Sequence, residues 1–285
     1  MKRLGISTDC ICDLPDEYLR ANGVDIMHFY IHTPTGRFKD GVEITSANIL
    51  EYLESGEKLL KSNIPAAEEY KVFFEKILQR YDHVIHITTS DKAGESFPHA
   101  QESLPMLGED GKRVTLINSK QLSTGLGHLV LKAVEMRDQG KSVEEIVAVC
   151  EEMRERISSS FIVPDADYLY HMGRVSKGVR NLSKFFRLHP VLFMKDGKIT
   201  VKSFQMGNYE KSVLRYVRSE FKQAERIDRR QLFITHAGSP AKIIRQIMAE
   251  AEILCPFEKV TVTIASSAIS SNCGPQTVGV LFVCK

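Results

Sequence analysis

The stretch Leu4-Gly5-Ile6-Ser7-Thr8-Asp9-Cys10-Ile11-Cys12-Asp13-Leu14-Pro15 joins a short apolar run to a turn rich in hydroxyl and carboxyl groups. The same arrangement returns where the apolar run 84–87 leads into residues 88–94, and where 114–117 leads into 118–125. In an open α/β sheet, the loops after the carboxyl ends of the strands form the ligand crevice. Hydroxyl groups and the unpaired N–H groups of a helix N-terminus suit a small acidic group there. The sequence therefore predicts an anion site at one edge of a sheet, without an obvious group to attack the ligand.

Short apolar runs alternate with amphipathic stretches through the first half of the chain. The apolar spacing predicts helices over residues 16–22, 46–53, 66–80, 125–139 and 142–157, the second with Ser46 as its N-cap. Residues 24–32 are strand-like and lead into a turn at 33–36. Strand and helix in alternation predict a parallel sheet that is covered by helices on both faces.

The pattern changes near Ser158-Ser159-Ser160. Lys195-Asp196-Gly197 separates two apolar runs, and an Asp-Gly pair in this setting predicts a β-hairpin. A basic amphipathic helix is expected over 176–188, with further helices over 209–225 and 240–254 and strands over 161–163, 232–235, 260–265 and 278–283. We therefore predict an α/β chain of two domains: residues 1–158 with a parallel sheet, and residues 159–285 with a mixed sheet.

The composition argues against several classes of partner. The formal net charge is +2 and no dense Lys/Arg block is present, so nucleic acid is not expected as a partner. No run approaches the ~18–20 apolar residues of a membrane span. Met1-Lys2-Arg3-Leu4 carries no export signal, which predicts a cytoplasmic protein with its six cysteines reduced. The cysteines lack metal-finger spacing, and small apolar fillers of a tight turn are favoured over a metal or redox pair for Cys10 and Cys12.

Eight short motifs follow one another over nearly the whole chain. They are Thr8-Asp9-Cys10 with Asp13-Leu14-Pro15; Gly36 with Asp40-Gly41-Val42; Ser62-Asn63-Ile64-Pro65; Thr89-Ser90-Asp91-Lys92-Ala93-Gly94; Ser123-Thr124-Gly125-Leu126-Gly127; Tyr168-Leu169 with Gly173-Arg174-Val175-Ser176; His189-Pro190-Val191-Leu192 with Asp196-Gly197-Lys198-Ile199; and Asn272-Cys273-Gly274-Pro275 with Gly279. In this order they resemble the DegV family, bacterial fatty-acid-binding proteins whose members deliver acyl chains to a fatty acid kinase.

The resemblance implies a two-domain DegV-like fold that buries a long-chain fatty acid in a tunnel, without catalysis and without a cofactor other than the bound acid. By position, Ser62, Ser90 and Ala93 would hold the carboxylate. Ala93 replaces a serine of the family motif and leaves only its backbone N–H. Asn272 replaces a histidine, so it can donate and accept hydrogen bonds but cannot carry a charge. Arg174 and Asn272 are the candidate contacts to the kinase partner or to phosphate, and a structural arginine that ties a loop to a helix end is the alternative for Arg174.

Apolar burial would supply most of the affinity, because each CH₂ of an acyl chain contributes ~0.8 kcal/mol on transfer from water. Several apolar residues could line the tunnel, although ordinary core packing is favoured for each one taken singly. They are Phe29, Ile31, Phe73, Leu126, Leu129, Phe161, Leu192 and Phe193. The rival interpretation is a phosphate- or sugar-phosphate-binding enzyme of a related α/β fold. The sequence has no phosphate-binding loop, no Gly-x-Ser-x-Gly elbow and no metal cluster to support it. A purely structural or regulatory protein that binds no lipid is the third possibility.

Overall fold

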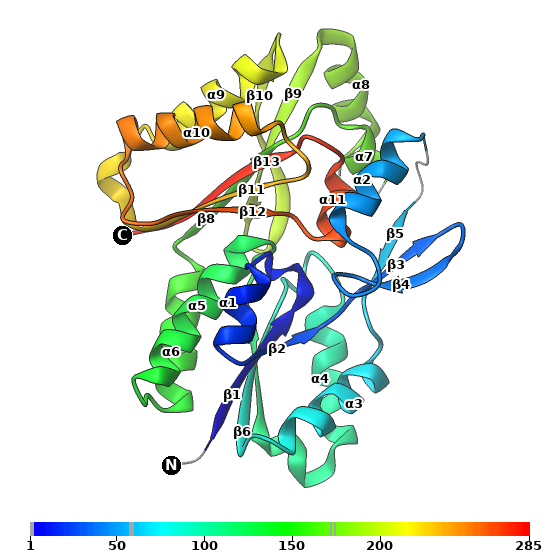
Figure 1. The fold of residues 1–285 in the computed structure, drawn as a ribbon, viewed down its shortest axis with the longest axis vertical. Helices are drawn as coiled ribbons and strands as arrows, with labels where there is room; N and C mark the ends of the chain where they lie inside the picture. Colours follow the sequence, from blue (N-terminus) through cyan, green and yellow to red (C-terminus); the bar gives the residue numbers. More distant parts are fainter. Residues whose placement is uncertain (1–2, 57–59, 172, 174) are drawn as a thin grey trace.

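The computed structural model describes residues 3–56, 60–171, 173 and 175–285, in which the strands form three sheets (Figure 1). The first sheet has the order β2-β1-β6-β7 and every pairing in it is parallel. Its strands are β1 (Leu4–Asp9), β2 (Val24–Met27), β6 (His83–Thr88) and β7 (Val114–Asn118). The predicted parallel sheet of the N-terminal half is confirmed.

Helices cover both faces of this sheet (Figure 1). Ile6, Ile85 and Ile117 point to one face and pack against α5 and α6, whereas Val84 and Val114 point to the other and pack against α3 and α4. Apolar residues occupy successive positions in these strands because both faces are buried. The helices of this half are α1 (Asp16–Ala21), α2 (Ser46–Glu54), α3 (Ala67–Leu78), α4 (Ser96–Met106), α5 (Thr124–Asp138) and α6 (Val143–Arg154), with short 3-10 helices η1 (Cys10–Cys12) and η2 (Gly108–Arg113).

The second sheet is mixed, as predicted, with the order β10-β9-β8-β13-β11-β12 and one parallel pairing, β11 with β12. Asp196 and Gly197 both have positive φ, 49° and 82°, and form the tight turn of the predicted hairpin. The strands are β8 (Ile157–Ile162), β9 (Leu188–Lys195), β10 (Lys198–Met206), β11 (Ile227–His236), β12 (Val260–Ile264) and β13 (Val278–Cys284). The helices are α7 (Asp167–His171), α8 (Lys177–Phe186), α9 (Tyr209–Glu220), η3 (Ala224–Arg226), α10 (Ala241–Leu254) and α11 (Ser267–Cys273).

The prediction of one strand over residues 24–32 was wrong. The chain leaves the parallel sheet after Met27 and forms a small antiparallel sheet of order β4-β3-β5, with β3 (Tyr30–Thr33), β4 (Gly36–Lys39) and β5 (Lys61–Asn63). The break is held at Phe29, whose backbone N–H donates to Cys10 Sγ (3.2 Å) and whose carbonyl accepts from the backbone N–H of Asp40 (2.9 Å). These contacts come from distant segments, so the local sequence does not indicate the break.

The N-cap of α2 is Thr45 and not Ser46 as predicted. The Thr45 side chain accepts from the backbone N–H of Asn48, and the Asn48 side chain accepts from the backbone N–H of Thr45, which completes a capping box. The Ser46 hydroxyl instead bonds to that of Ser270 in α11, 2.7 Å away. Ser46 therefore links the first third of the chain to its last helix.

Helix α5 lies between the two large sheets and contacts both (Figure 1). A single hydrophobic cluster contains Leu126 and Leu129 of α5 together with Phe233 and Leu281 of the second sheet. At the start of α5, the Thr124 hydroxyl bonds to that of Thr235, at 2.8 Å. The division into domains 1–158 and 159–285 stays a prediction, and the hydrophobic cluster joins residues of the two halves.

Candidate functional site

Helix α11 is held at its N-terminus by two buried carboxyl groups from the other end of the chain. Asp13 Oδ1 accepts from the backbone N–H of Ser266 (2.9 Å). Asp40 Oδ1 and Oδ2 accept from the backbone N–H groups of Ser267 (3.0 Å) and Ala268 (2.8 Å). These groups begin the helix and have no intrahelical acceptor. Asp13 and Asp40 therefore fix the position of α11, which carries part of the site.

Burial raises the pKa of both carboxyl groups. The pKa of Asp13 rises from 3.8 to about 7, although hydrogen bonds from Ser123 and Ser266 lower it in part. The pKa of Asp40 is also raised by burial, against the lowering effect of its hydrogen bonds with Ser267 and Ala268. Burial outweighs the stabilisation of the ionised form by these donors, so the folded chain binds a proton at Asp13 more tightly than the unfolded chain does.

We expect Asp13→Asn to flatten part of the pH dependence of stability. Because the pKa of Asp13 is near 3.8 in the unfolded chain and about 7 in the folded one, its contribution is fully present below pH 4 and is lost as the pH rises to about 7. The free energy of unfolding of the parent, minus that of the variant, should fall across this window by up to ~1.4 kcal/mol per pH unit. Urea unfolding between pH 4 and 8 measures it, with the exposed Asp16→Asn as control. A difference that does not change with pH would contradict the assignment.

The first cavity lies beside α11, which lines it with Ala268, Ile269, Asn272 and Cys273. It brings together Ser62, Ala93 and Asn272, three of the residues predicted from the motifs. Asn272 Nδ2 donates to Ser62 Oγ (3.1 Å) and to the Ala268 carbonyl (2.6 Å). Ser62 thus accepts a hydrogen bond, and its own hydroxyl proton is donated to none of the described residues. A ligand oxygen in the cavity can accept that proton.

Thr89 is a further candidate that the sequence analysis did not name, although it belongs to a quoted motif. It is the first residue after β6 and lines the first cavity. Its backbone N–H and carbonyl are both engaged, with Asp9 Oδ2 and Thr88 Oγ1, but its hydroxyl makes no hydrogen bond within the described part of the chain. Its position directly at the end of a buried strand was the available signal.

Ser90 does not line the cavity, which corrects its predicted role. Its hydroxyl is fully buried and donates to the Gly197 carbonyl (2.7 Å), so its single proton is already engaged. Nor is the backbone N–H of Ala93 free, because it donates to the Ser90 carbonyl (3.0 Å). Gly197 must lack a side chain here, since a Cβ would lie 2.6 Å from Ser90 Oγ. Ser90 therefore attaches the β9–β10 hairpin to the turn at 89–94.

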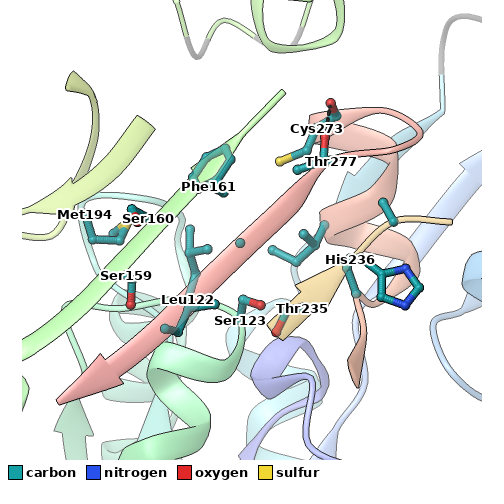
Figure 2. A pocket seen from close by; sticks show the side chains of 15 residues that line it. Leu122, Ser123, Ser159, Ser160, Phe161, Met194, Thr235, His236, Cys273 and Thr277 are labelled. Atoms are coloured by element: carbon teal, nitrogen blue, oxygen red, sulfur yellow. Dashed lines mark hydrogen bonds between the residues drawn. The ribbon is translucent and has the colours of Figure 1, made fainter. Parts of the chain in front are cut away.

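A second cavity shares lining residues with the first and lies against β8, β11 and β13 of the mixed sheet (Figure 2). Its accessible wall is almost entirely apolar. Its hydroxyl groups mostly bond within the protein; for example, Ser160 bonds to Tyr216, and Thr277 donates to the Cys273 carbonyl. Four residues line both cavities: Leu122, Phe161, Ile269 and Cys273. The two cavities therefore share part of their lining. Among the residues that the structure describes, unengaged hydroxyl groups lie in the first cavity, on Ser62 and Thr89, and in the second, on Ser159.

The other predicted residues have mixed outcomes. Arg174 lies outside the described residues. Of the apolar residues considered for a tunnel, Phe29 and Phe161 line the first cavity, whereas the others line neither cavity. His236 lines the second cavity, and burial lowers its pKa. Cys10 and Cys12 lie on η1 rather than on an extended segment.

Two classes of structure are absent from residues 3–56, 60–171, 173 and 175–285. No cluster of three His, Cys, Asp or Glu side chains is arranged to bind a metal ion. No helix combines the length and the apolar composition that crossing a membrane requires.

Comparison with known proteins places the chain in a family. The DegV family model, described as "Uncharacterised protein, DegV family", matches residues 3–285. The chain belongs to the DegV family. A DegV domain-containing protein of Caldanaerobacter subterraneus subsp. tengcongensis is 27% identical over 284 residues, which is 99% of either chain. The resemblance seen in the short motifs is thereby confirmed.

Several solved structures, DegV family proteins among them, have the same fold. A DegV family protein from Thermus thermophilus, described under fatty acid binding, superimposes with a TM-score of 0.86 at 24% identity and covers 99% of this chain and 100% of its own. A stearic-acid-binding protein from Eubacterium ventriosum gives 0.85 at 22% identity, with 100% of this chain and 99% of its own covered. A DegV family protein from Eubacterium eligens, loaded with heptadecanoic acid, gives 0.86 at 16% identity, with 99% and 100% covered. The DegV fold therefore extends over the whole of this chain.

Proposed function

We propose that the chain binds one long-chain fatty acid. The carboxylate lies between the hydroxyl groups of Ser62 and Thr89, and the acyl chain runs past Phe161 into the second cavity. The observation that carries this proposal is the pair of apolar cavities that share lining residues, with unengaged hydroxyl groups in the first. The solved relatives described with a fatty acid, stearic acid and heptadecanoic acid support it.

The chemistry of the cavities suits such a ligand. Burial of a 16-carbon chain at ~0.8 kcal/mol per CH₂ supplies the larger part of the affinity, so a few hydroxyl donors suffice to orient the head group. Among the described residues that line the first cavity, none carries an Asp, Glu, Lys, Arg or His side chain. The carboxylate therefore depends on hydrogen bonds rather than on an ion pair with these residues.

Removal of the Ser62 hydroxyl should weaken binding of the acid. A hydrogen bond to a charged group contributes ~1.5–3 kcal/mol, so Ser62→Ala should raise the Kd of hexadecanoic acid by roughly 10- to 100-fold. Native mass spectrometry of the purified protein gives the bound mass, and calorimetry with delipidated protein gives the Kd. Ser55→Ala, on an exposed helix end, is the control. Unchanged affinity for hexadecanoic acid in Ser62→Ala would refute this placement of the head group. Failure of the parent protein to bind any fatty acid would refute the proposed function.

We further propose that the chain is not an enzyme but a cytoplasmic carrier that presents the acid to a separate fatty acid kinase. Ser7, His86 and Asp9 resemble a catalytic triad, with Ser7 Oγ 2.9 Å from His86 Nδ1 and His86 Nε2 3.6 Å from Asp9 Oδ1. All three side chains are fully buried and line neither cavity, so a substrate cannot reach the serine. This supports binding over hydrolysis.

The carrier role requires a partner for turnover. The protein incubated with ATP, Mg²⁺ and hexadecanoic acid should release no ADP above background, and acyl phosphate should form only when a cognate kinase is added. Asn272 directs its amide N–H groups inward, to Ser62 and Ala268, so we propose a role in the head-group site for it rather than at the kinase. Arg174 remains the proposed partner contact on the sequence alone. ADP release in proportion to this protein would favour the phosphate-binding enzyme.

A further inference from the structure

We propose that Asp9 is the residue that positions the head-group hydroxyl of Thr89, through a buried hydrogen-bond network that lines neither cavity. Asp9 ends β1 and is fully buried. Its Oδ2 accepts from the backbone N–H of Thr89 (2.7 Å) and from Ser96 Oγ (2.6 Å). Its Oδ1 accepts from the Tyr70 hydroxyl (3.0 Å). This inference rests on the proposed function.

The network fixes the Thr89 peptide from both sides. Asp9 holds the N–H, and the Thr88 hydroxyl donates to the Thr89 carbonyl (3.0 Å). The next residue is held as well, because the backbone N–H of Ser90 donates to the Gln121 carbonyl (2.9 Å). With its backbone held at these points, Thr89 keeps its hydroxyl as the one polar group available to a ligand.

The second oxygen of Asp9 is steadied by Tyr70. Burial, together with the negative charge of Asp9, raises the pKa of Tyr70 well above its ordinary value, so its hydroxyl stays protonated and donates. Tyr70 lies on α3 and Ser96 on α4, so both helices contribute to the orientation of one carboxylate. The Asp9 carboxylate accepts from three donors in fixed directions and therefore has little rotational freedom. The Thr89 peptide, whose N–H is one of these donors, is restricted in the same way.

The test separates positioning of the head group from general stability by use of two ligands, hexadecanoic acid and its methyl ester. Asp9→Ala removes the acceptor for the Thr89 N–H and should raise the Kd of the acid about 10-fold, with a change of less than about 3-fold for the ester, since hydrogen bonds to charged groups are the stronger ones. Asp9→Asn should bind both ligands nearly as the parent does, because its amide oxygen can accept from Thr89 and its NH₂ can donate to Tyr70. In a Thr89→Val background, Asp9→Ala should have no further effect on the acid.

Tyr70→Phe provides a second route where Asp9→Ala does not fold. It removes one donor to Asp9 and keeps the apolar packing, and it should weaken acid binding by about 2- to 5-fold in the parent but not in Thr89→Val. Equal losses for acid and ester, or additive losses with Thr89→Val, would overturn the inference while leaving fatty acid binding intact. A parent protein that binds neither ligand would overturn both this inference and the proposed function.

Discussion

Cys273→Phe should abolish tight binding of hexadecanoic acid while leaving the shorter decanoic acid nearly unaffected. Cys273 is buried and lines both cavities, so an aromatic ring in its place fills the part that they share. If the acyl chain of hexadecanoic acid ends at this ring, about six of its CH₂ groups stay in water. At ~0.8 kcal/mol for each CH₂, the binding free energy is weaker by ~5 kcal/mol. We therefore expect the Kd of the longer acid to rise at least ~100-fold, measured by calorimetry on delipidated protein.

The matched control for this substitution is Cys273→Ala, which removes the thiol and adds no volume. It should bind both acids within a few-fold of the parent. Thermal unfolding of Cys273→Phe checks the fold, because overpacking of a filled core costs ~1–3 kcal/mol whereas a ring that enters an empty cavity costs less. Equal weakening of both acids would mean that the acyl chain does not pass Cys273.

Asp40→Ala should destabilise the folded chain by about 2–6 kcal/mol. It leaves the backbone N–H groups of Ser267 and Ala268 buried without an acceptor, and each such group costs ~1–3 kcal/mol. Since α11 carries Ala268, Ile269, Asn272 and Cys273 of the cavity wall, fatty acid binding should weaken as well. Urea unfolding measures the loss of stability, and we expect the midpoint to fall while the m-value stays unchanged.

Asp40→Asn provides the graded comparison for that variant. Its amide oxygen can accept from one of the two N–H groups but its NH₂ faces the other, so its free energy of unfolding should lie between those of the parent and Asp40→Ala. Equal stability of all three proteins would show that the start of α11 is solvated and that Asp40 does not hold it.

Much of the architecture was predictable because its signals are local. Buried strands such as β6 are followed by turns and helices, and Asp196-Gly197 indicates its hairpin within two residues. The sheet β4-β3-β5 was not predictable, since its strands have three or four residues and depend on Phe29, which is held by Cys10 and Asp40. Helix α11 escaped prediction for a related reason: its sequence is small and polar, and the groups that stabilise its start lie near the other end of the chain.

The sequence predicted part of the lining of the first cavity. The motifs named Ser62, Ala93 and Asn272, which the structure brings to one cavity, and their role in binding stays a prediction. The motifs did not distinguish Thr89 from Ser90, because the sequence does not indicate which of two adjacent hydroxyl side chains at a strand end faces the cavity. Their side chains differ in surroundings: Thr89 lines the cavity and Ser90 reaches the Gly197 carbonyl. Only the position of the β9–β10 hairpin, more than a hundred residues away, decides between them.

The attachment of α11 to Asp13 and Asp40 also sets an order of events during synthesis. Asp40 is 227 residues from Ser267, and Asp13 is 253 residues from Ser266. At about 5–20 residues per second, Asp40 must wait roughly 10–45 s on the ribosome before Ser267 is even made. Until then both carboxylates stay hydrated in a nascent chain whose cavity has no wall on this side. On the proposed function, we therefore expect fatty acid uptake to begin only after the last helix has left the ribosome.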